Sequence, residues 1–290
     1  MSRKPLPLLM PAPTLRERMR DPHLAIFDCR FSLADTSAGR RAHAAGHLPG
    51  AVYAHLDEQL SGPITPATGR HPLPEPARLA GWLQAQGVGD ETDVVVYDDQ
   101  GGAFAVRLWW LLRWLGHERV AVLDGGIGAW RAAGGVLTTT APEPTAAATL
   151  NARPDDSRWL TTDALAAALP TGAVQVIDAR APERFRGEQE PIDPVAGHIP
   201  GAINLPFAGN LDANGCFLPA AELRRRFEEA LGDDCRGVGG PERVAHSCGS
   251  GVNACHNLLA MELAGLTGSR LYAGSWSEWI RDPHRPIATG

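Results

Sequence analysis

The stretch RVAHSCGSGVNACHNLLAMELAG, residues 243–265, decides how the rest of the chain folds. It begins with a short apolar run and continues through Cys248 into the loop Gly249-Ser250-Gly251. From Ala254 onward, leucine and methionine recur every three or four residues, which predicts a helix that ends near Gly265. The pattern therefore predicts a buried strand, a tight loop and a helix, with a cysteine as the first residue of the loop.

A cysteine between a strand and a helix N-terminus has a reactive environment. The first backbone N–H groups of a helix have no partner within the helix, and they point toward the preceding loop. Together with the helix dipole they favour the thiolate, the nucleophilic form of cysteine. A lone cysteine is more often a buried structural residue, but the neighbouring glycines let the backbone curl around the sulfur. We therefore interpret Cys248 as a nucleophile.

Two known kinds of loop place a nucleophilic cysteine ahead of a helix. Cysteine phosphatases use C-x5-R, in which the arginine grips the phosphate, but Ala254 stands at that position here. The loop instead resembles that of the rhodanese-like sulfurtransferases, and CGSGVNAC is similar to the C-G-S-G-V-T-A-C of the 3-mercaptopyruvate group. Thiosulfate-preferring relatives typically carry C-R-K-G-V-T, where this chain has the uncharged Gly249 and Ser250. Asn253 replaces the usual threonine and keeps a hydrogen-bonding side chain.

The chain also contains an internal repeat. Asp28-Cys29-Arg30 returns as Asp178-Ala179-Arg180, and GHLPGA at 46–51 returns as GHIPGA at 197–202. Each copy alternates short β-branched runs with helical patterns, which predicts a parallel sheet flanked by helices. These landmarks resemble tandem rhodanese domains over nearly the whole chain. The sequence therefore predicts an α/β fold of two tandem rhodanese-like domains, with ligands at the carboxyl ends of the strands.

The repeat divides the chain into two domains. We expect an N-terminal domain at 1–140, a linker rich in Pro, Thr and Ala at 141–156, and a C-terminal catalytic domain at 157–290. In the first copy Asp98 stands at the position of Cys248, and a carboxylate cannot carry a transferable sulfur, so we interpret the first domain as non-catalytic. The expected strands are 25–27, 94–97, 120–123, 174–177, 244–246 and 270–272, and the expected helices are 77–86, 103–115, 162–169, 220–231 and 254–264.

The resemblance implies further catalytic residues. In the 3-mercaptopyruvate group, a serine of the cysteine loop is paired with a histidine and an aspartate of the first domain. Ser250, His71 and Asp57 match these positions, and such a set can relay a proton. Without the resemblance, His71 and Asp57 would be read as ordinary polar residues of surface loops.

The resemblance also implies how the donor is bound. DARAPERFRG, residues 178–187, is similar to a family segment in which an arginine holds the carboxylate or sulfonate of the donor, and Arg184 matches that arginine. A guanidinium can pair with both oxygens of a carboxylate. Vertebrate-type relatives carry a second arginine a few residues later, but 188–195, EQEPIDPV, contains no cation, and Arg186 is a weaker substitute. Within the loop we expect the substrate to contact Gly249, Gly251, Val252 and Asn253.

Composition limits the partners and the cofactors. A formal net charge of −6 argues against nucleic acid, and no apolar run approaches the ~20 residues of a membrane span. Five scattered cysteines suit a reducing compartment, so we expect a cytoplasmic protein. No histidine or cysteine cluster has the spacing of a metal site, so we expect neither a metal nor another cofactor.

The sequence thus predicts a sulfurtransferase. The Cys248 thiolate would take sulfur from 3-mercaptopyruvate as a persulfide and pass it to cyanide, a small thiol or a thioredoxin-like protein. Three alternatives stay open at this point. They are a thiosulfate-preferring rhodanese, a cysteine phosphatase, and a non-enzymatic persulfide carrier or binding module.

Overall fold

A computed structural model of the 290-residue chain describes residues 6–143, 146–232 and 240–290. These residues form two compact units. Unit 1 comprises the described parts of Met1–Gly62, Pro74–Asp155 and Ala213–Phe217, and unit 2 comprises the described parts of Pro63–Leu73, Asp156–Asp212 and Leu218–Gly290. Cys235 lies outside the described residues. Two short segments, 63–73 and 213–217, thus belong to a unit to which the sequence repeat alone does not assign them.

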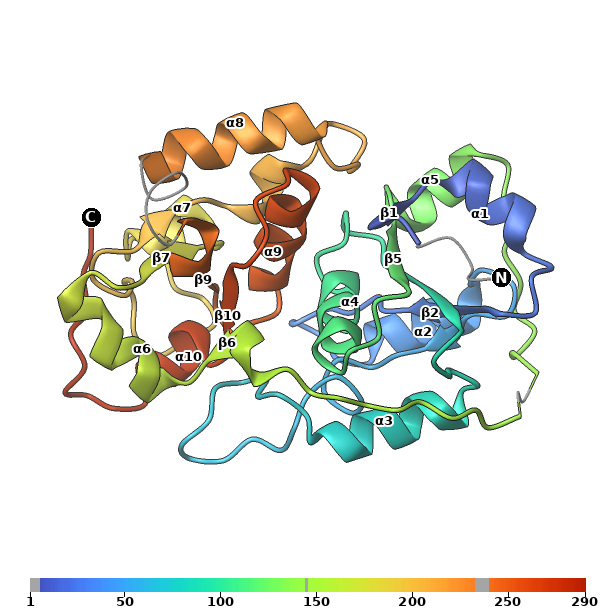
Figure 1. Ribbon diagram of the computed structural model, residues 1–290, viewed down its shortest axis with the longest axis horizontal. Helices are drawn as coiled ribbons and strands as arrows, with labels where there is room; N and C mark the ends of the chain where they lie inside the picture. Colours follow the sequence, from blue (N-terminus) through green and yellow to red (C-terminus); the bar gives the residue numbers. More distant parts are fainter. Residues whose placement is uncertain (1–5, 144–145, 233–239) are drawn as a thin grey trace. The chain divides into compact units, whose positions relative to one another are not determined.

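Each unit is built on one five-stranded sheet whose paired strands run parallel (Figure 1). The strand order is β1-β5-β4-β2-β3 in unit 1 and β6-β10-β9-β7-β8 in unit 2, so the two sheets have the same topology. This confirms the predicted α/β fold of two tandem domains. The strands are β1 (Leu9–Met10), β2 (Leu24–Asp28), β3 (Val52–Tyr53), β4 (Asp93–Tyr97), β5 (Val120–Leu123), β6 (Trp159–Leu160), β7 (Gln175–Asp178), β8 (Ile203–Asn204), β9 (Val244–Ser247) and β10 (Arg270–Tyr272).

Helices flank both sheets, and none in the described part of the chain is long and apolar enough to cross a membrane. The α-helices are α1 (Ala12–Arg18), α2 (Ala38–Ala45), α3 (Pro76–Ala85), α4 (Ala105–Trp114), α5 (Gly126–Ala132), α6 (Thr162–Ala168), α7 (Pro182–Phe185), α8 (Ala220–Leu231), α9 (Ala254–Leu263) and α10 (Ser275–Trp279). Short 3-10 helices are η1 (Asp156–Arg158), η2 (Leu169–Thr171), η3 (Phe207–Asn210) and η5 (Gly240–Arg243). Both α4 and α9 are buried around almost their whole circumference, as expected for helices enclosed by other elements.

The central strands and the longer helices lie where the sequence predicts them. The bounds of β5, β10 and α8 agree with the prediction, and those of β9 and α9 differ from it by one residue. The prediction missed β1, β3, β6 and β8, each of which has two residues. A two-residue strand shows no alternation of apolar and polar side chains, so a periodicity argument cannot find it.

The repeated D-x-R motif forms the same buried ion pair in both units. In unit 2, Arg180 donates from Nη2 to the Asp178 carboxylate at 2.7 Å and to the carbonyl of Gly197 at 2.8 Å. In unit 1, Arg30 makes a matching pair with Asp28. An arginine fork that binds a carboxylate and a backbone carbonyl together ties the end of a strand to a following loop. The motif therefore has a structural role in each copy.

Part of the predicted linker is packed on unit 1. The backbone N–H of Ala148 donates to the carbonyl of Gln84 in α3 at 3.1 Å, and the N–H of Arg153 donates to the carbonyl of Leu115 at 2.8 Å. Buried backbone groups need such partners. Residues 148–155 therefore belong to the fold of unit 1, to which the contact pattern also assigns them.

Candidate active site

Cys248 directly follows β9, the middle strand of the sheet in unit 2. The cysteine is 2% exposed, and the backbone N–H of Gly251 donates to its Sγ at 3.2 Å. Gly251 has a φ of +78°, and a Cβ there would lie 2.4 Å from the carbonyl oxygen of Ala273, so only glycine fits. The loop thus curls around the sulfur at the carboxyl end of the central strand, as the sequence predicts.

The first residues of α10 hold the cysteine loop in place. Ser275 Oγ accepts a hydrogen bond from the backbone N–H of Cys248 at 3.0 Å. The N–H groups of Trp276 and Ser277 donate to the carbonyls of Cys248 and Gly249 at 3.0 and 2.9 Å. These contacts fix the backbone on both sides of the sulfur, which gives the nucleophile a defined direction.

Ser250 and His71 are in contact within unit 2. The Nδ1 of His71 lies 2.7 Å from Ser250 Oγ, and each residue is 5% exposed. A hydrogen bond of this length between a hydroxyl and an imidazole can pass a proton. Asp57 belongs to unit 1, so its part in the predicted set of three stays a prediction.

The segment that carries His71 is attached to unit 2 by backbone hydrogen bonds. The N–H of Gly69 donates to Glu278 Oε2 at 3.1 Å, and the N–H of Arg70 donates to Ser277 Oγ at 3.0 Å. Both acceptors lie on α10, whose first residues also hold the cysteine loop. The same short helix therefore positions the nucleophile and the histidine segment.

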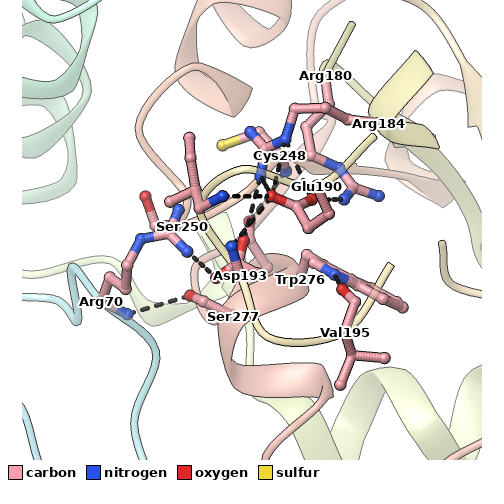
Figure 2. Close-up of polar contacts among 12 residues, drawn as sticks. Arg70, Arg180, Arg184, Glu190, Asp193, Val195, Cys248, Ser250, Trp276 and Ser277 are labelled. Atoms are coloured by element: carbon pink, nitrogen blue, oxygen red, sulfur yellow. Dashed lines mark hydrogen bonds and ion pairs between the residues drawn. The ribbon is translucent and has the colours of Figure 1, made fainter. Parts of the chain in front are cut away.

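Arg184 projects from α7 into a cluster of buried carboxylates (Figure 2). Its Nε donates to both oxygens of Glu190 at 3.1 Å, and its Nη2 donates to Glu190 at 2.6 Å and to Asp193 at 3.2 Å. Glu190 also accepts from Arg180 at 3.3 Å. Residues 188–195, where the sequence contains no second arginine, thus supply the two carboxylates that hold Arg184.

Arg186 lies elsewhere. Its Nε donates to Glu188 at 2.8 Å, and its side chain is 41% exposed. Hydrogen bonding to Glu188 raises the pKa of the Arg186 guanidinium. The structure therefore pairs this arginine with a surface carboxylate, which leaves it a poor substitute for a second donor-binding cation.

A different arginine, Arg70, lies beside the cysteine loop, and the sequence reasoning missed it. Its Nη1 is paired with Asp193, and its Nη2 lies 2.9 Å from where a Cβ on Gly249 would be. Burial lowers the pKa of the Arg70 guanidinium, and the negative charge of a Cys248 thiolate opposes this. The signal available in the sequence was its position next to His71.

The other predicted loop residues have mixed surroundings. Val252 is 3% exposed, and its carbonyl accepts from the N–H of Cys255 at 3.1 Å. Asn253 is the N-cap residue of α9, although its side chain accepts no capping hydrogen bond. No group of three or more His, Cys, Asp or Glu side chains within the described ranges could hold a metal ion.

Asp98 fills the equivalent loop of unit 1. Its carboxylate accepts four backbone hydrogen bonds of 2.8 to 2.9 Å, from the N–H groups of Gln100, Gly102, Phe104 and Ala105. Burial raises the pKa of Asp98, and these hydrogen bonds oppose that rise. The loop ahead of a buried helix is thus an anion cradle, and in this copy a fixed carboxylate occupies it.

Comparisons with known proteins agree with this architecture. The model of the Rhodanese-like domain matches residues 11–133 and 161–282. A protein of Pseudomonas aeruginosa named as a probable 3-mercaptopyruvate sulfurtransferase is 51% identical over 284 residues, which cover 97% of this chain and 98% of that protein. A Mycobacterium tuberculosis protein provisionally named a thiosulfate sulfurtransferase is 41% identical over 270 residues, covering 92% of this chain and 91% of that protein.

A solved structure has the same arrangement of elements. The 3-mercaptopyruvate sulfurtransferase from Leishmania major matches with a TM-score of 0.83 at 31% identity, covering 96% of this chain and 75% of that chain. The two matched family segments together span most of the sequence, and each contains four of the five strands of one parallel sheet, since β1 and β6 lie just before them. On the sequence match, the shared fold and the cysteine loop, the chain belongs to the rhodanese family, as a tandem-domain sulfurtransferase.

Proposed function

We propose that the chain takes sulfur from 3-mercaptopyruvate through a persulfide on Cys248. The observation that carries this proposal is the 2.7 Å contact between His71 and Ser250, two residues beyond the nucleophile. Mercaptopyruvate is a thiol, so its sulfur carries a proton that must leave before or during transfer. A serine–histidine pair at the sulfur supplies a route for that proton.

The first step forms a sulfur–sulfur bond and breaks a carbon–sulfur bond. The Cys248 thiolate attacks the sulfur of the donor, and the electron pair of the C–S bond passes to the three-carbon fragment as the enolate of pyruvate. The enolate takes up a proton and becomes pyruvate, while Cys248 holds the sulfur as a persulfide. The N–H of Gly251, which donates to Cys248 Sγ, stabilises negative charge on the sulfur.

The second step returns the enzyme to its starting state. A nucleophilic acceptor attacks the outer sulfur of the persulfide, and the Cys248 thiolate leaves. Cyanide, a small thiol or a reduced thioredoxin-like protein can act in this way, because each is a soft nucleophile. Such acceptors are available in a reducing compartment, and we therefore place the protein in the cytoplasm.

The other predicted site residues have supporting roles in this proposal. Arg184 binds the carboxylate of the donor, and the backbone of Gly249, Gly251, Val252 and Asn253 surrounds the transferred sulfur. Asp57 completes the proton relay from the first domain. That domain carries no nucleophile of its own, because its cradle holds the Asp98 carboxylate.

Thiosulfate is the second candidate donor. Its favouring observation is that two guanidinium groups, those of Arg70 and Arg184, lie against Gly249 and supply positive charge for a dianion. Thiosulfate has no proton on its outer sulfur, so it would not need the Ser250–His71 pair. The presence of that pair ranks mercaptopyruvate first.

Intact-mass spectrometry tests the proposal. The protein is exposed briefly to mercaptopyruvate or, separately, to thiosulfate, with Cys248→Ser as the negative variant. Cys255→Ser is the matched control, because Cys255 is a buried cysteine of the following helix. We expect mercaptopyruvate to add one sulfur atom to the wild type and to Cys255→Ser but not to Cys248→Ser. A gain with thiosulfate alone would overturn the donor assignment.

Two further results address the remaining alternatives. Stable loading without release to cyanide or thiols would favour a persulfide carrier with a dedicated protein acceptor. Hydrolysis of a small aryl phosphate that Cys248→Ser abolishes would favour the phosphatase. The absence of an arginine at Ala254 argues against that second result.

A further inference from the structure

Ser277, a buried residue of α10, binds both of the segments that meet at the Ser250–His71 pair. Its backbone N–H donates to the carbonyl of Gly249 in the cysteine loop at 2.9 Å, and its Oγ accepts from the backbone N–H of Arg70 at 3.0 Å (Figure 2). The residues that follow these two in the sequence, Ser250 and His71, are in contact at 2.7 Å and close a ring. One residue of α10 therefore holds the backbone on both sides of the contact.

Glu278, the next residue of α10, holds the histidine segment, residues 63–73, at a second point. Its Oε2 accepts from the backbone N–H of Gly69 at 3.1 Å, and its Oε1 accepts from Thr162 Oγ at 2.5 Å. The threonine hydroxyl has one proton, so in its 2.9 Å contact with Tyr272 the tyrosine hydroxyl is the donor. Burial raises the pKa of Tyr272, which keeps this hydroxyl protonated. The carboxylate that receives Gly69 is thus itself tied to the first residue of α6 and to the end of β10.

Two glycines let the histidine segment lie directly against the start of α10. A Cβ on Gly69 would lie 2.7 Å from Ser277 Oγ and 2.8 Å from the carbonyl oxygen of Gly274. A Cβ on Gly274 would lie 2.6 Å from the Cδ atom of Glu278. All three distances are shorter than van der Waals contact allows. The backbone of the segment therefore meets the helix with no side chain between them.

From these contacts we propose that Ser277 and Glu278 are positioning residues of the proton relay. They act through the backbone just before His71, which sets where the imidazole stands. Their effect is confined to steps that move a proton, such as the loss of the thiol proton of mercaptopyruvate. The inference rests on the proposed function, since it names the residues that keep the relay of that function in place.

Proton transfer through the relay depends on a short distance. The heavy atoms of such a pair must lie about 2.6–3.2 Å apart, and the contact between His71 and Ser250 lies near the lower end of this range. Loss of one anchor leaves a backbone N–H of the segment without its partner and lets the segment shift. The segment stays attached, because Arg281 Nε still donates to the carbonyl of Thr68 at 3.0 Å. Loss of an anchor should therefore slow the proton step and leave the fold intact.

The test measures single-turnover formation of the persulfide at saturating mercaptopyruvate, so that a change in donor affinity does not contribute. Ser277→Ala removes the acceptor of the Arg70 N–H and keeps the backbone bond to the cysteine loop. We expect Ser277→Ala and Glu278→Ala each to slow this reaction by about 10- to 100-fold, the effect of a misplacement of up to about 1 Å. The matched control is Glu222→Ala, at an exposed glutamate of α8.

Two further variants address the same contact. Glu278→Gln should stay near wild type, because its amide oxygen can accept from Gly69 while its amide nitrogen donates to Thr162. Gly69→Ala acts from the opposite side of the contact, since its methyl group would push the segment away from α10. We expect it to slow the reaction as Ser277→Ala does, although it removes no hydrogen-bonding group.

Two readouts separate positioning of the relay from a general structural role. Alkylation of Cys248 by iodoacetamide, followed by peptide mass, forms a carbon–sulfur bond, releases iodide and moves no proton from the thiolate. Its rate should be the same in wild type, Ser277→Ala and Gly69→Ala. When either substitution is added to His71→Ala, mercaptopyruvate transfer should become no slower than in His71→Ala alone, because both act through that histidine.

The outcomes that contradict the inference are distinct from those that contradict the proposed function. Slower alkylation of Cys248, additive losses in the His71→Ala background, or unchanged rates in Ser277→Ala and Glu278→Ala would overturn the inference. A wild type that mercaptopyruvate does not load, although iodoacetamide alkylates Cys248, would instead refute the proposed function.

Discussion

The backbone N–H of Cys248 donates to Ser275 Oγ at 3.0 Å, and Ser275 has a φ of +51°. Among the described residues it is the only non-glycine residue with a positive φ. A non-glycine residue in this region is strained by about 1 kcal/mol or more. Its hydroxyl also donates to the carbonyl of Tyr272 at 3.0 Å, so the strained residue links the nucleophile to the end of β10.

This linkage predicts different effects for two substitutions of Ser275. Ser275→Ala keeps the strained backbone but removes the acceptor, so the buried N–H of Cys248 loses its partner at a cost of about 1–3 kcal/mol. Ser275→Gly loses the same acceptor but relieves the strain, so it should be less destabilising. Urea unfolding of both variants checks the order. An alanine variant as stable as the glycine variant would contradict the strain argument.

A second prediction concerns the acid stability of unit 2. His246 lies in β9, is 0% exposed, and has a pKa that burial lowers from 6.5 to about 3. Between these two pH values, the His246 imidazole stays neutral in the folded protein but binds a proton in the unfolded chain. The stability that neutral His246 confers is complete above about pH 6.5 and is lost progressively as the pH falls toward about 3.

The variant His246→Gln isolates this effect. Replacing the histidine should remove about 2 kcal/mol of the stability difference between pH 7 and pH 5, because a pKa unit corresponds to about 1.4 kcal/mol. Urea unfolding at the two pH values measures the free energy of unfolding of each variant. Because the substitution also changes packing at both pH values, the readout is the difference in this free energy between pH 7 and pH 5. His284→Gln, at an exposed position, is the control. Equal pH dependence in His246→Gln and wild type would exclude His246 as the source.

The sequence could predict the parts of this molecule that depend on local patterns. The apolar runs of β4 and β9 and the buried helix α9 are visible as hydrophobic segments, and the loop at Cys248 is visible as cysteine followed by glycines. Arg70 could not be assigned in this way. Arg70 lies in the segment Pro63–Leu73. This segment belongs to unit 2, although in the sequence it lies between two parts of unit 1.

The second missed feature, Ser275, has a related explanation. A positive φ at a serine leaves no signal in sequence, since turn propensity favours glycine or asparagine there. Two hydrogen bonds of the Ser275 hydroxyl, from the N–H of Cys248 and to the carbonyl of Tyr272, offset the strain. Contacts between distant segments decide both features, and a single sequence without related sequences does not reveal such contacts.

A third prediction separates the two candidate donors through the Ser250–His71 pair. Ser250→Ala and His71→Ala should each lower the rate of sulfur transfer from mercaptopyruvate by about 10²- to 10⁴-fold, the usual contribution of a positioned proton-transfer group. Transfer from thiosulfate should change little, because thiosulfate has no proton to move. Single-turnover kinetics of persulfide formation with each donor provide the measurement.

The double variant and Asp57→Asn complete that experiment. Residues that act as one relay give non-additive losses, so the double variant should be about as slow as either single variant. Asp57→Asn should slow mercaptopyruvate transfer if the aspartate belongs to the relay. Additive losses, or equal losses with both donors, would show that Ser250 and His71 serve the loop structure and do not move a proton.

The last prediction concerns Gly249, whose missing side chain leaves room for Arg70. A Cβ at this position would lie 2.9 Å from Arg70 Nη2, which is closer than van der Waals contact allows. Because that atom is the end of a flexible side chain, Gly249→Ala should displace the guanidinium and leave the fold intact. We expect the KM for mercaptopyruvate to rise in Gly249→Ala, whereas the midpoint of urea unfolding changes little. Arg70→Gln removes the same guanidinium, so combining it with Gly249→Ala should raise KM little more than Gly249→Ala does alone. Fully additive increases in KM would mean that the alanine disturbs the cysteine loop directly and does not act by displacing Arg70.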